Sequence, residues 1–171
     1  NVYNALAACA VGRELGISPA DCARALAGYT PAGMRQKVVR RAGYTVVEDC
    51  YNASPDSMKA ALQTLAAWPG ASRRIAVLAD MLELGALEGP AHLEIGRLAA
   101  RLGVDLVLAY GPAARLYVQG AEEAGGQARH FETKAALLQA LQGTLRPGDV
   151  VWFKGSHSMA LEEVLEGLYT A

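Results

Sequence analysis

The sequence of 171 residues contains 52% hydrophobic and 19% charged residues, which is enough apolar material for one domain core and part of a second. Its 16 basic and 17 acidic residues give a formal net charge of -1, so the chain offers no electrostatic footprint for nucleic acid or for insertion at an anionic membrane. The cysteines, Cys9, Cys22 and Cys50, have no paired spacing, which indicates neither a disulfide framework nor a zinc site and favours a reducing cytoplasm.

The first thirty residues have the pattern of a helix pair. The alanine-rich run 5–11 has helical periodicity, Gly16 is placed to end that helix, and Ser18 is placed to cap a second one that ends near Gly28. The opening residues lack an initiator methionine, and neither a signal peptide nor a membrane span is evident. We therefore expect the chain to begin inside a helix of a longer protein.

A linker follows the helix pair. Residues 29–33 combine turn and breaker residues, which makes them the best boundary candidate in the chain. The sequence therefore predicts that residues 1–30 end one domain and that residues 31–171 form another.

Beyond the linker, strand-like and helix-like runs alternate. The runs 75–78 and 104–108 are apolar without alternation, as expected of strands that helices cover on both faces. The first two strands are joined only by Ala42 and Gly43, which predicts a hairpin and an antiparallel edge strand. The predicted fold is α/β, a doubly wound, mostly parallel sheet with an antiparallel edge strand, preceded by the helix pair. The predicted strands cover residues 36–41, 44–49, 74–79, 105–110, 128–131 and 150–154, and the predicted helices cover residues 56–68, 90–102, 113–124, 133–145 and 159–169.

The loops that follow the strands carry the polar side chains of interest. The loop at 49–55 brings together a carboxylate, a phenol, an amide and a hydroxyl, and further loops lie at 79–85, 110–112 and 154–159. Ligands of open α/β sheets bind where strands end and helices begin. If the connections are right-handed crossovers, all four loops lie along one edge and form a candidate site.

Each of these side chains also has a structural interpretation. Asp49 could end its strand and cap the next turn, and Asn52 and Ser54 could be turn and N-cap residues. Asp80 and Glu83 could share one face of a short turn and hold a cation or a substrate amine, although an exposed acidic loop is the commoner explanation.

The remaining candidates carry weaker signals. Residues 154–156 resemble half of a phosphate-binding loop, but the glycine-rich lead is missing. His92 and His157 have no metal-ligand spacing and are interpreted as a helix-surface group and a loop group. Cys50 has no base nearby in the sequence, which favours a packing role over a nucleophile. We expect no metal ligands within this chain.

Five motifs in chain order carry a resemblance to a known family. They are NVYNALAA at 1–8, GMR at 33–35, DCYNASP at 49–55 with its continuation to 62, LADMLELG at 78–85, and KGSHSM at 154–159. Together they resemble the Mur ligases, and within that family the members that add D-alanyl-D-alanine to a peptidoglycan precursor. Two positions depart from the family pattern, Ala79 in place of a glycine and His157 in place of an arginine, and the roles of those two loops stay open.

The resemblance implies a reaction and its reactants. The intact enzyme would use ATP with Mg²⁺ to phosphorylate the terminal carboxylate of UDP-N-acetylmuramoyl-tripeptide, and the amine of D-alanyl-D-alanine would attack the acyl phosphate to form an amide. The phosphate loop and the metal ligands would precede residue 1. We therefore expect this chain to be inactive alone, to pack on the missing central domain, and to act as part of a cytoplasmic, monomeric enzyme.

The resemblance also implies roles for individual residues. Asn1 and Asn4 would contact the adenine region, because amides both donate and accept hydrogen bonds. Arg35 would bind the phosphates with its permanent charge and forked donors, and Asp49 would accept from ribose hydroxyls. Arg35 and Asp49 are the predicted catalytic residues. Substrate contacts are predicted for Tyr51, Asn52, Ser54, Asp80, Glu83, Lys154 and Ser156.

Other functions remain compatible with this pattern. A sibling Mur ligase or a folylpolyglutamate synthase relative is the nearest alternative, and residues 51–53 argue against it. A free-standing nucleotide-binding or receiver domain would also explain the architecture. A receiver should carry an acidic pocket at the first parallel strand and a lysine after the last strand, and Asp49 and Lys154 supply parts of that. Glu48 and Asp49 alternate across the strand, however, so that only one of them faces such a pocket. A non-catalytic interaction module would be favoured if the four loops were divided between opposite ends of the sheet.

Overall fold

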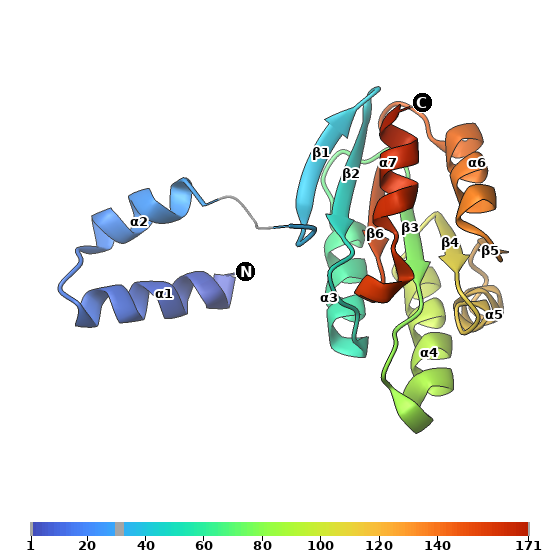
Figure 1. Ribbon diagram of the computed structural model, residues 1–171, viewed down its shortest axis with the longest axis horizontal. Coiled ribbons are helices and arrows are strands. Elements are labelled where there is room, and N and C mark those ends of the chain that lie inside the picture. Colours follow the sequence, from blue (N-terminus) through green and yellow to red (C-terminus); the bar gives the residue numbers. More distant parts are fainter. Residues whose placement is uncertain (1, 30–32, 171) are drawn as a thin grey trace. The chain divides into compact units, whose positions relative to one another are not determined.

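The computed structural model describes residues 2–29 and 33–170. The chain divides into two compact units, Asn1–Ala32 and Gly33–Ala171. The smaller unit is the predicted helix pair, and the larger unit is an α/β sheet domain (Figure 1).

The smaller unit consists of α1 (Val2–Glu14) and α2 (Pro19–Ala27). Gly16 ends α1 with a left-handed φ of 80°, and the Ile17 N–H donates to the Gly12 carbonyl at 2.9 Å, as in a Schellman motif. Ser18 caps α2 by accepting from the Asp21 N–H. Both helix ends thus follow from the residues that predicted them.

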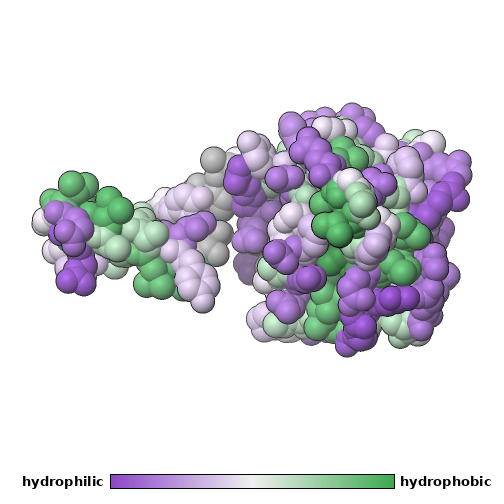
Figure 2. Space-filling view, turned by 90° about the horizontal axis from the view of Figure 1, so that it is seen from below, coloured by the Kyte–Doolittle hydropathy of each residue, from purple (hydrophilic) through white to green (hydrophobic). Residues whose placement is uncertain are grey.

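The helix pair leaves much apolar surface uncovered. Exposed large hydrophobic side chains on and just after α1 are Val2, Tyr3, Leu6, Val11, Leu15 and Ile17. Figure 2 shows hydrophobic residues in green on the surface of the helix pair. Two helices cannot bury such a surface against each other.

The larger unit follows the predicted alternation of strands and helices. Its strands are β1 (Lys37–Arg41), β2 (Tyr44–Asp49), β3 (Arg74–Ala79), β4 (Leu106–Tyr110), β5 (Ala128–Phe131) and β6 (Val150–Lys154). Its helices are α3 (Pro55–Ala66), α4 (Glu88–Arg101), α5 (Arg115–Glu123), α6 (Lys134–Thr144) and α7 (Glu162–Thr170), with 3-10 turns η1 (Gly85–Leu87) and η2 (His157–Met159).

The sheet has the strand order β1-β2-β6-β3-β4-β5. β1 pairs antiparallel with β2 through a hairpin in which Ala42 and Gly43 both have positive φ, at 48° and 83°, as a primed turn requires. The other pairs are parallel. The predicted mostly parallel sheet with an antiparallel edge strand is confirmed, and the carboxyl ends of β2, β6, β3, β4 and β5 all lie at one edge.

Helices cover both faces of the sheet (Figure 1). Side chains of α3, α4 and α5 pack on one face and those of α6 and α7 on the other. Consecutive residues of β3 alternate between the two, with Ala76 and Leu78 in the first core and Ile75 and Val77 in the second. Burial on both faces explains why this strand is apolar throughout.

Several element boundaries differ from the prediction. β1 begins at Lys37 because Gln36 has a φ of 54°, outside the strand region. α7 begins at Glu162 rather than 159, since η2 and a left-handed Ala160 precede it. α4 starts at Glu88, two residues before Pro90, because a proline is tolerated in the first turn, where no N–H has a partner within the helix.

Candidate functional site

The loops after three neighbouring parallel strands meet at the carboxyl edge of the sheet. β6 lies between β2 and β3, so the loop after β6 contacts both of the others. The Ser156 N–H donates to the Asp80 carbonyl at 3.1 Å, and the Leu82 N–H donates to Ser156 Oγ at 2.9 Å. Because the loops share one edge, the condition that would favour a divided interaction module is not met.

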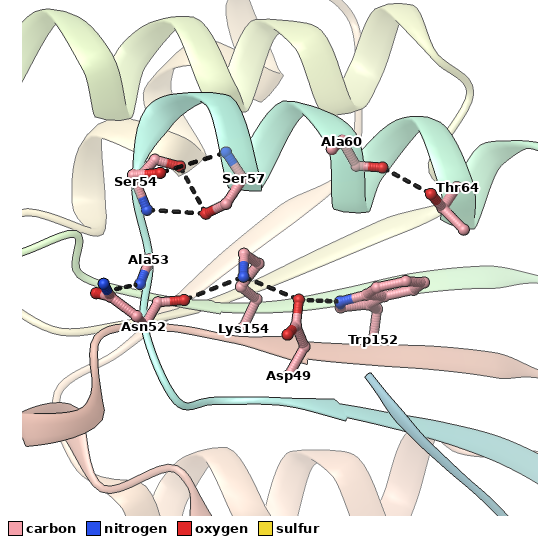
Figure 3. A network of polar contacts seen from close by, with 9 residues as sticks. All are labelled: Asp49, Asn52, Ala53, Ser54, Ser57, Ala60, Thr64, Trp152 and Lys154. Atoms are coloured by element: carbon pink, nitrogen blue, oxygen red, sulfur yellow. Dashed lines mark hydrogen bonds and ion pairs between the residues drawn. The ribbon is translucent and has the colours of Figure 1, made fainter. Parts of the chain in front are cut away.

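A buried ion pair joins the β6 and β2 ends of the site. Lys154 Nζ donates to Asp49 Oδ2 at 2.8 Å and to the Asn52 carbonyl at 3.0 Å (Figure 3). The Trp152 indole N–H also points at Asp49 Oδ2, at 3.4 Å. Lys154 is only 3% exposed. The geometry gives Lys154 the role of holding the β2 loop and does not support a direct phosphate contact.

Asp49 keeps part of its predicted capacity for a ligand. Its Oδ2 is taken by Lys154, whereas no described residue donates to its Oδ1. Glu48, its neighbour, points to the other face, where its carboxylate accepts from the Tyr169 hydroxyl at 2.7 Å. The predicted alternation of Glu48 and Asp49 across the strand is therefore confirmed.

The loop between β2 and α3 is organised by local hydrogen bonds. Ser54 caps α3: its Oγ faces the Ser57 N–H at 3.4 Å, and Ser57 Oγ accepts from the Ser54 N–H at 2.9 Å (Figure 3). Asn52 Oδ1 accepts from the Ala53 N–H at 2.8 Å. The predicted cap is confirmed, and the exposed Asn52 side chain keeps its amide N–H groups free of any described acceptor.

Arg35 and Tyr51 stack at the entrance of this loop. The Arg35 guanidinium carbon lies 3.8 Å from the centroid of the Tyr51 ring, and the ring of His157 lies 5.9 Å from that centroid. Tyr51 is 48% exposed. The β2 loop, the β6 loop and the segment before β1 thus each contribute one side chain to a common cluster.

Asp80 has a structural role instead of the predicted substrate contact. It is 3% exposed, and its carboxylate accepts from the N–H groups of Ala113 and Ala114 at 3.3 and 2.7 Å. Burial raises its pKa, which these two hydrogen bonds only partly offset. Glu83, by contrast, is exposed and left-handed, with a φ of 65°. The two carboxylates therefore lie in different environments, that of Asp80 buried and that of Glu83 exposed.

His92 is buried, which corrects its interpretation as a helix-surface group. Its Nδ1 donates to the Glu88 carbonyl at 2.7 Å, and its Nε2 accepts from the Met81 N–H at 3.0 Å. Its ring lies 4.6 Å from that of Tyr117. These bonds fix the tautomer and hold the β3 loop to α4. Apolar residues around position 92 at helical spacing were the signal that could have placed it in the core.

The remaining predicted residues are placed as follows. Ser156 is 7% exposed and ties two loops together through Leu82, so it does not face a ligand directly. Asn4 is exposed on α1, and Asn1 lies outside the described residues. Cys50 is 1% exposed and packs in the core on the α6 and α7 face, as its interpretation as a packing group predicts, and burial raises the pKa of its thiol to about 12.

No cluster of three or more metal-ligating side chains occurs in the described parts of the chain, 2–29 and 33–170. The longest helix of these residues, α4, has 14 residues, and none is long and apolar enough to cross a bilayer.

The larger unit matches a known family model. Residues 34–157 match the model described as Mur ligase, glutamate ligase domain. The chain belongs to the Mur ligase family. The resemblance noted in the five sequence motifs is thereby confirmed.

Named Mur ligases resemble the chain over nearly its whole length. The UDP-N-acetylmuramoyl-tripeptide–D-alanyl-D-alanine ligase of Bacillus subtilis is 40% identical over 171 residues, which is 98% of this chain and 37% of that protein. A crystal structure of MurF from Acinetobacter baumannii superposes with a TM-score of 0.86 and 31% identity, over 100% of this chain and 37% of that one. The chain thus spans little more than a third of the length of these two relatives.

A third relative bears on the nucleotide. MurF ligase from Thermotoga maritima, solved in complex with ADP, is 27% identical, with a TM-score of 0.77, over 94% of this chain and 36% of that one. Mur ligases of this kind are ATP-dependent. Both solved structures agree with the sheet architecture found here.

Sequence reasoning missed two parts of this Mur ligase site. The Trp152 indole near Asp49 lies on a strand whose apolar pattern concealed it, and the alternation of faces along β6 was the available signal. The contact between Tyr51 and His157 joins positions 106 residues apart by their numbering, and no local pattern indicates it. Ala79 is buried in the core against Gly155, so this departure from the family motif lies inside the fold.

Proposed function

We propose that the chain is the carboxyl-terminal part of an ATP-dependent Mur ligase that joins D-alanyl-D-alanine to UDP-N-acetylmuramoyl-tripeptide through an acyl phosphate. The observation that carries this proposal is the β2 loop. It presents the Tyr51 phenol and the Asn52 amide at the carboxyl edge, beside Arg35, in a chain whose similar relatives are named for this reaction.

The nucleotide contacts proposed are those of Asn1, Asn4, Arg35 and Asp49. Arg35 fits a phosphate because one face of its guanidinium stacks on Tyr51, while no described residue accepts from its N–H groups. Asp49 Oδ1 is similarly available for a ribose hydroxyl. Bound ATP with Mg²⁺ would supply the phosphoryl group, and its metal ligands are proposed to lie outside this chain.

The acceptor contacts proposed are fewer than the sequence suggested. Tyr51, Asn52 and Glu83 are exposed, and the Asn52 amide can donate to a carboxylate of the dipeptide. Lys154, Ser156 and Asp80 are proposed to act indirectly, because their buried side chains hydrogen-bond to the loops after β2, β3 and β4 and hold them in place. Holding an acceptor amine near an activated carboxylate supplies orientation, which is a major source of rate in such reactions.

The helix pair is proposed to complete a preceding ATP-binding domain. Residues 1–30 would end that domain, and residues 31–171 would be the Mur ligase carboxyl-terminal domain. The exposed apolar side chains of α1 support this division, because a further core would bury them. The parent enzyme is proposed to be monomeric and cytoplasmic, and the isolated chain to be inactive.

The proposal is tested by turnover in the longer protein. ADP formation should depend on both UDP-N-acetylmuramoyl-tripeptide and D-alanyl-D-alanine, and the 171-residue chain alone should form none. Glutamate and alanine serve as competing acceptors: if either supports turnover better than the dipeptide, the acceptor assignment is wrong and a sibling activity replaces it.

The role of Asn52 gives a sharper test. Asn52→Asp replaces a donor by a charged acceptor without changing shape, so the KM for D-alanyl-D-alanine should rise at least tenfold while that for ATP stays the same. Gln63→Glu makes the same chemical change on the exposed surface of α3 and should alter neither constant. Equal effects of the two changes would remove Asn52 from the acceptor site.

A further inference from the structure

The Arg35 guanidinium is contacted on its planar face by the Tyr51 ring, and not at its N–H groups. Its guanidinium carbon is 3.8 Å from the Tyr51 centroid, a distance typical of a cation–π contact. Among residues 2–29 and 33–170, no carboxylate or carbonyl accepts a hydrogen bond from Arg35. A stacked guanidinium keeps its donors in the plane of the group, so they stay available for an anion.

The ring that supports Arg35 is itself contacted by another loop. Tyr51 follows the buried Cys50 at the end of β2, and its ring lies 5.9 Å from that of His157, tilted by 31°. His157 begins η2, directly after the loop that Ser156 fastens to the β3 loop. The position of the Tyr51 ring is thereby linked to the β6 loop.

We infer that Tyr51 is a positioning residue for Arg35, and that His157 sets the orientation of the Tyr51 ring. Arg35 lies in a segment without helix or strand, where an exposed arginine would otherwise sample many rotamers. Stacking reduces this freedom before any ligand binds. This inference rests on the proposed function, because the anion that Arg35 meets is taken to be the nucleotide phosphate or the phosphoryl group in transfer.

The stack can be measured without turnover. In the 171-residue chain, ring currents of Tyr51 should move the NMR signals of the Arg35 side chain away from those of a free arginine. Tyr51→Leu should abolish this displacement, Tyr51→Phe should keep it, and His157→Ala should reduce it. The Arg129 side chain, 5.2 Å from the Phe131 ring, is the internal reference and should not change. An Arg35 signal insensitive to Tyr51→Leu would overturn the inference.

A double-mutant cycle in the longer protein tests the consequence of this inference for catalysis. At saturating acceptor, Tyr51→Leu should lower kcat/KM for ATP by roughly threefold to tenfold, and Tyr51→Phe should recover most of that loss. A residue that acts through Arg35 has no effect once Arg35 is gone, so Tyr51→Leu should cost nothing further in an Arg35→Ala background. Equal losses in both backgrounds would overturn the inference.

The cycle also separates this inference from the proposed function. It is run with whichever acceptor supports ADP formation, D-alanyl-D-alanine, glutamate or alanine, so a wrong acceptor assignment leaves the coupling of Arg35 and Tyr51 measurable. Arg129→Ala removes an exposed arginine–ring contact outside the candidate site and should leave kcat/KM unchanged. His157→Phe, which keeps a ring at that position, should behave more like the unaltered enzyme than His157→Ala does.

Discussion

The ammonium of Lys154 and the carboxylate of Asp49 form a buried ion pair, 2.8 Å apart, at the adjoining carboxyl ends of β6 and β2. The two side chains are 4% and 11% exposed. Taking both charges out of water is costly, and the pair offsets this cost because each group satisfies the other while the Asn52 carbonyl and the Trp152 indole add further hydrogen bonds. It explains how the β2 loop keeps its shape at the edge of the site.

Replacing one partner of this ion pair should lower the stability of the chain more than replacing both partners. Lys154→Met leaves an uncompensated buried carboxylate and should lower the free energy of unfolding by about 3–5 kcal/mol, whereas Asp49→Asn combined with Lys154→Met should recover part of that loss. Denaturant unfolding of the chain measures both. Lys59→Met removes a lysine paired with Asp56 on the surface and should cost less than about 1 kcal/mol. A double variant as unstable as Lys154→Met alone would show that burial of the charge is not the cause.

The ion pair also illustrates what the sequence could and could not predict. The ends of β2, β3 and β6 were predicted correctly because apolar runs stop there at polar or small residues. Lys154 and Asp49 were both candidates, but they are 105 residues apart, and nothing local indicates that they meet. Sequence patterns place residues on an edge of the sheet. Which side chains at that edge pair with each other depends on strand order.

Sequence patterns also fail where a residue adopts a conformation or an environment that is unusual for its type. Ala160 and Gln36 adopt positive φ although neither is a glycine or asparagine, so the starts of α7 and β1 were misplaced by sequence. His92 was misassigned because a polar residue on a helix is usually exposed, and only its two hydrogen bonds make burial tolerable. The fold was predictable from the periodicity of the sequence. These exceptions depend on tertiary contacts, which the sequence does not show.

The close approach of α4 and α5 depends on two glycines. A Cβ at Gly96 would lie 2.0 Å from the Tyr117 carbonyl oxygen, and one at Gly120 would lie 2.0 Å from that of Leu93. Because backbone cannot move aside as a side chain can, Gly96→Ala or Gly120→Ala should force the helices apart and destabilise the chain by about 2–4 kcal/mol.

A third glycine provides the matched control for this prediction. Gly143 lies in α6, and a Cβ at this position would meet no atom within 4 Å, so Gly143→Ala should be neutral or stabilising by up to about 1 kcal/mol. Thermal unfolding of the three variants checks the sign. Similar destabilisation in all of them would indicate that helix propensity, not the crossing of α4 and α5, decides the outcome.

Asp80 should give stability a specific pH dependence. Burial raises its pKa above the ordinary value, so the folded state favours the protonated form. Its contribution is therefore fully present below the ordinary aspartate pKa of about 3.9 and is lost as the pH rises through the raised value. Asp80→Asn cannot ionise, so the stability of this variant relative to the unaltered chain should increase as the pH rises above the ordinary aspartate pKa of about 3.9.

The measurement is the difference in unfolding free energy between these two chains at a series of pH values. The part of this difference that does not change with pH reports the loss of the acceptor for the Ala113 N–H. Only its change with pH reports the ionisation of Asp80. A difference that stays constant, or that falls with rising pH, would contradict the raised pKa.

The Cys50 thiol should not react with alkylating reagents until the chain unfolds, locally or globally. The residue is 1% exposed, and burial raises the pKa of its thiol to about 12, so at pH 8 the thiol is neither accessible nor ionised to a useful extent. Iodoacetamide at pH 8 should therefore modify the partly exposed Cys9 first and Cys50 only in denaturant, with mass spectrometry of peptides as the readout. Because Cys50 directly precedes Tyr51, its labelling rate under native conditions also reports opening of the β2 loop. Labelling of Cys50 as fast as that of Cys9 would show that this loop is open in the native chain, contrary to the buried Asp49–Lys154 pair that holds it.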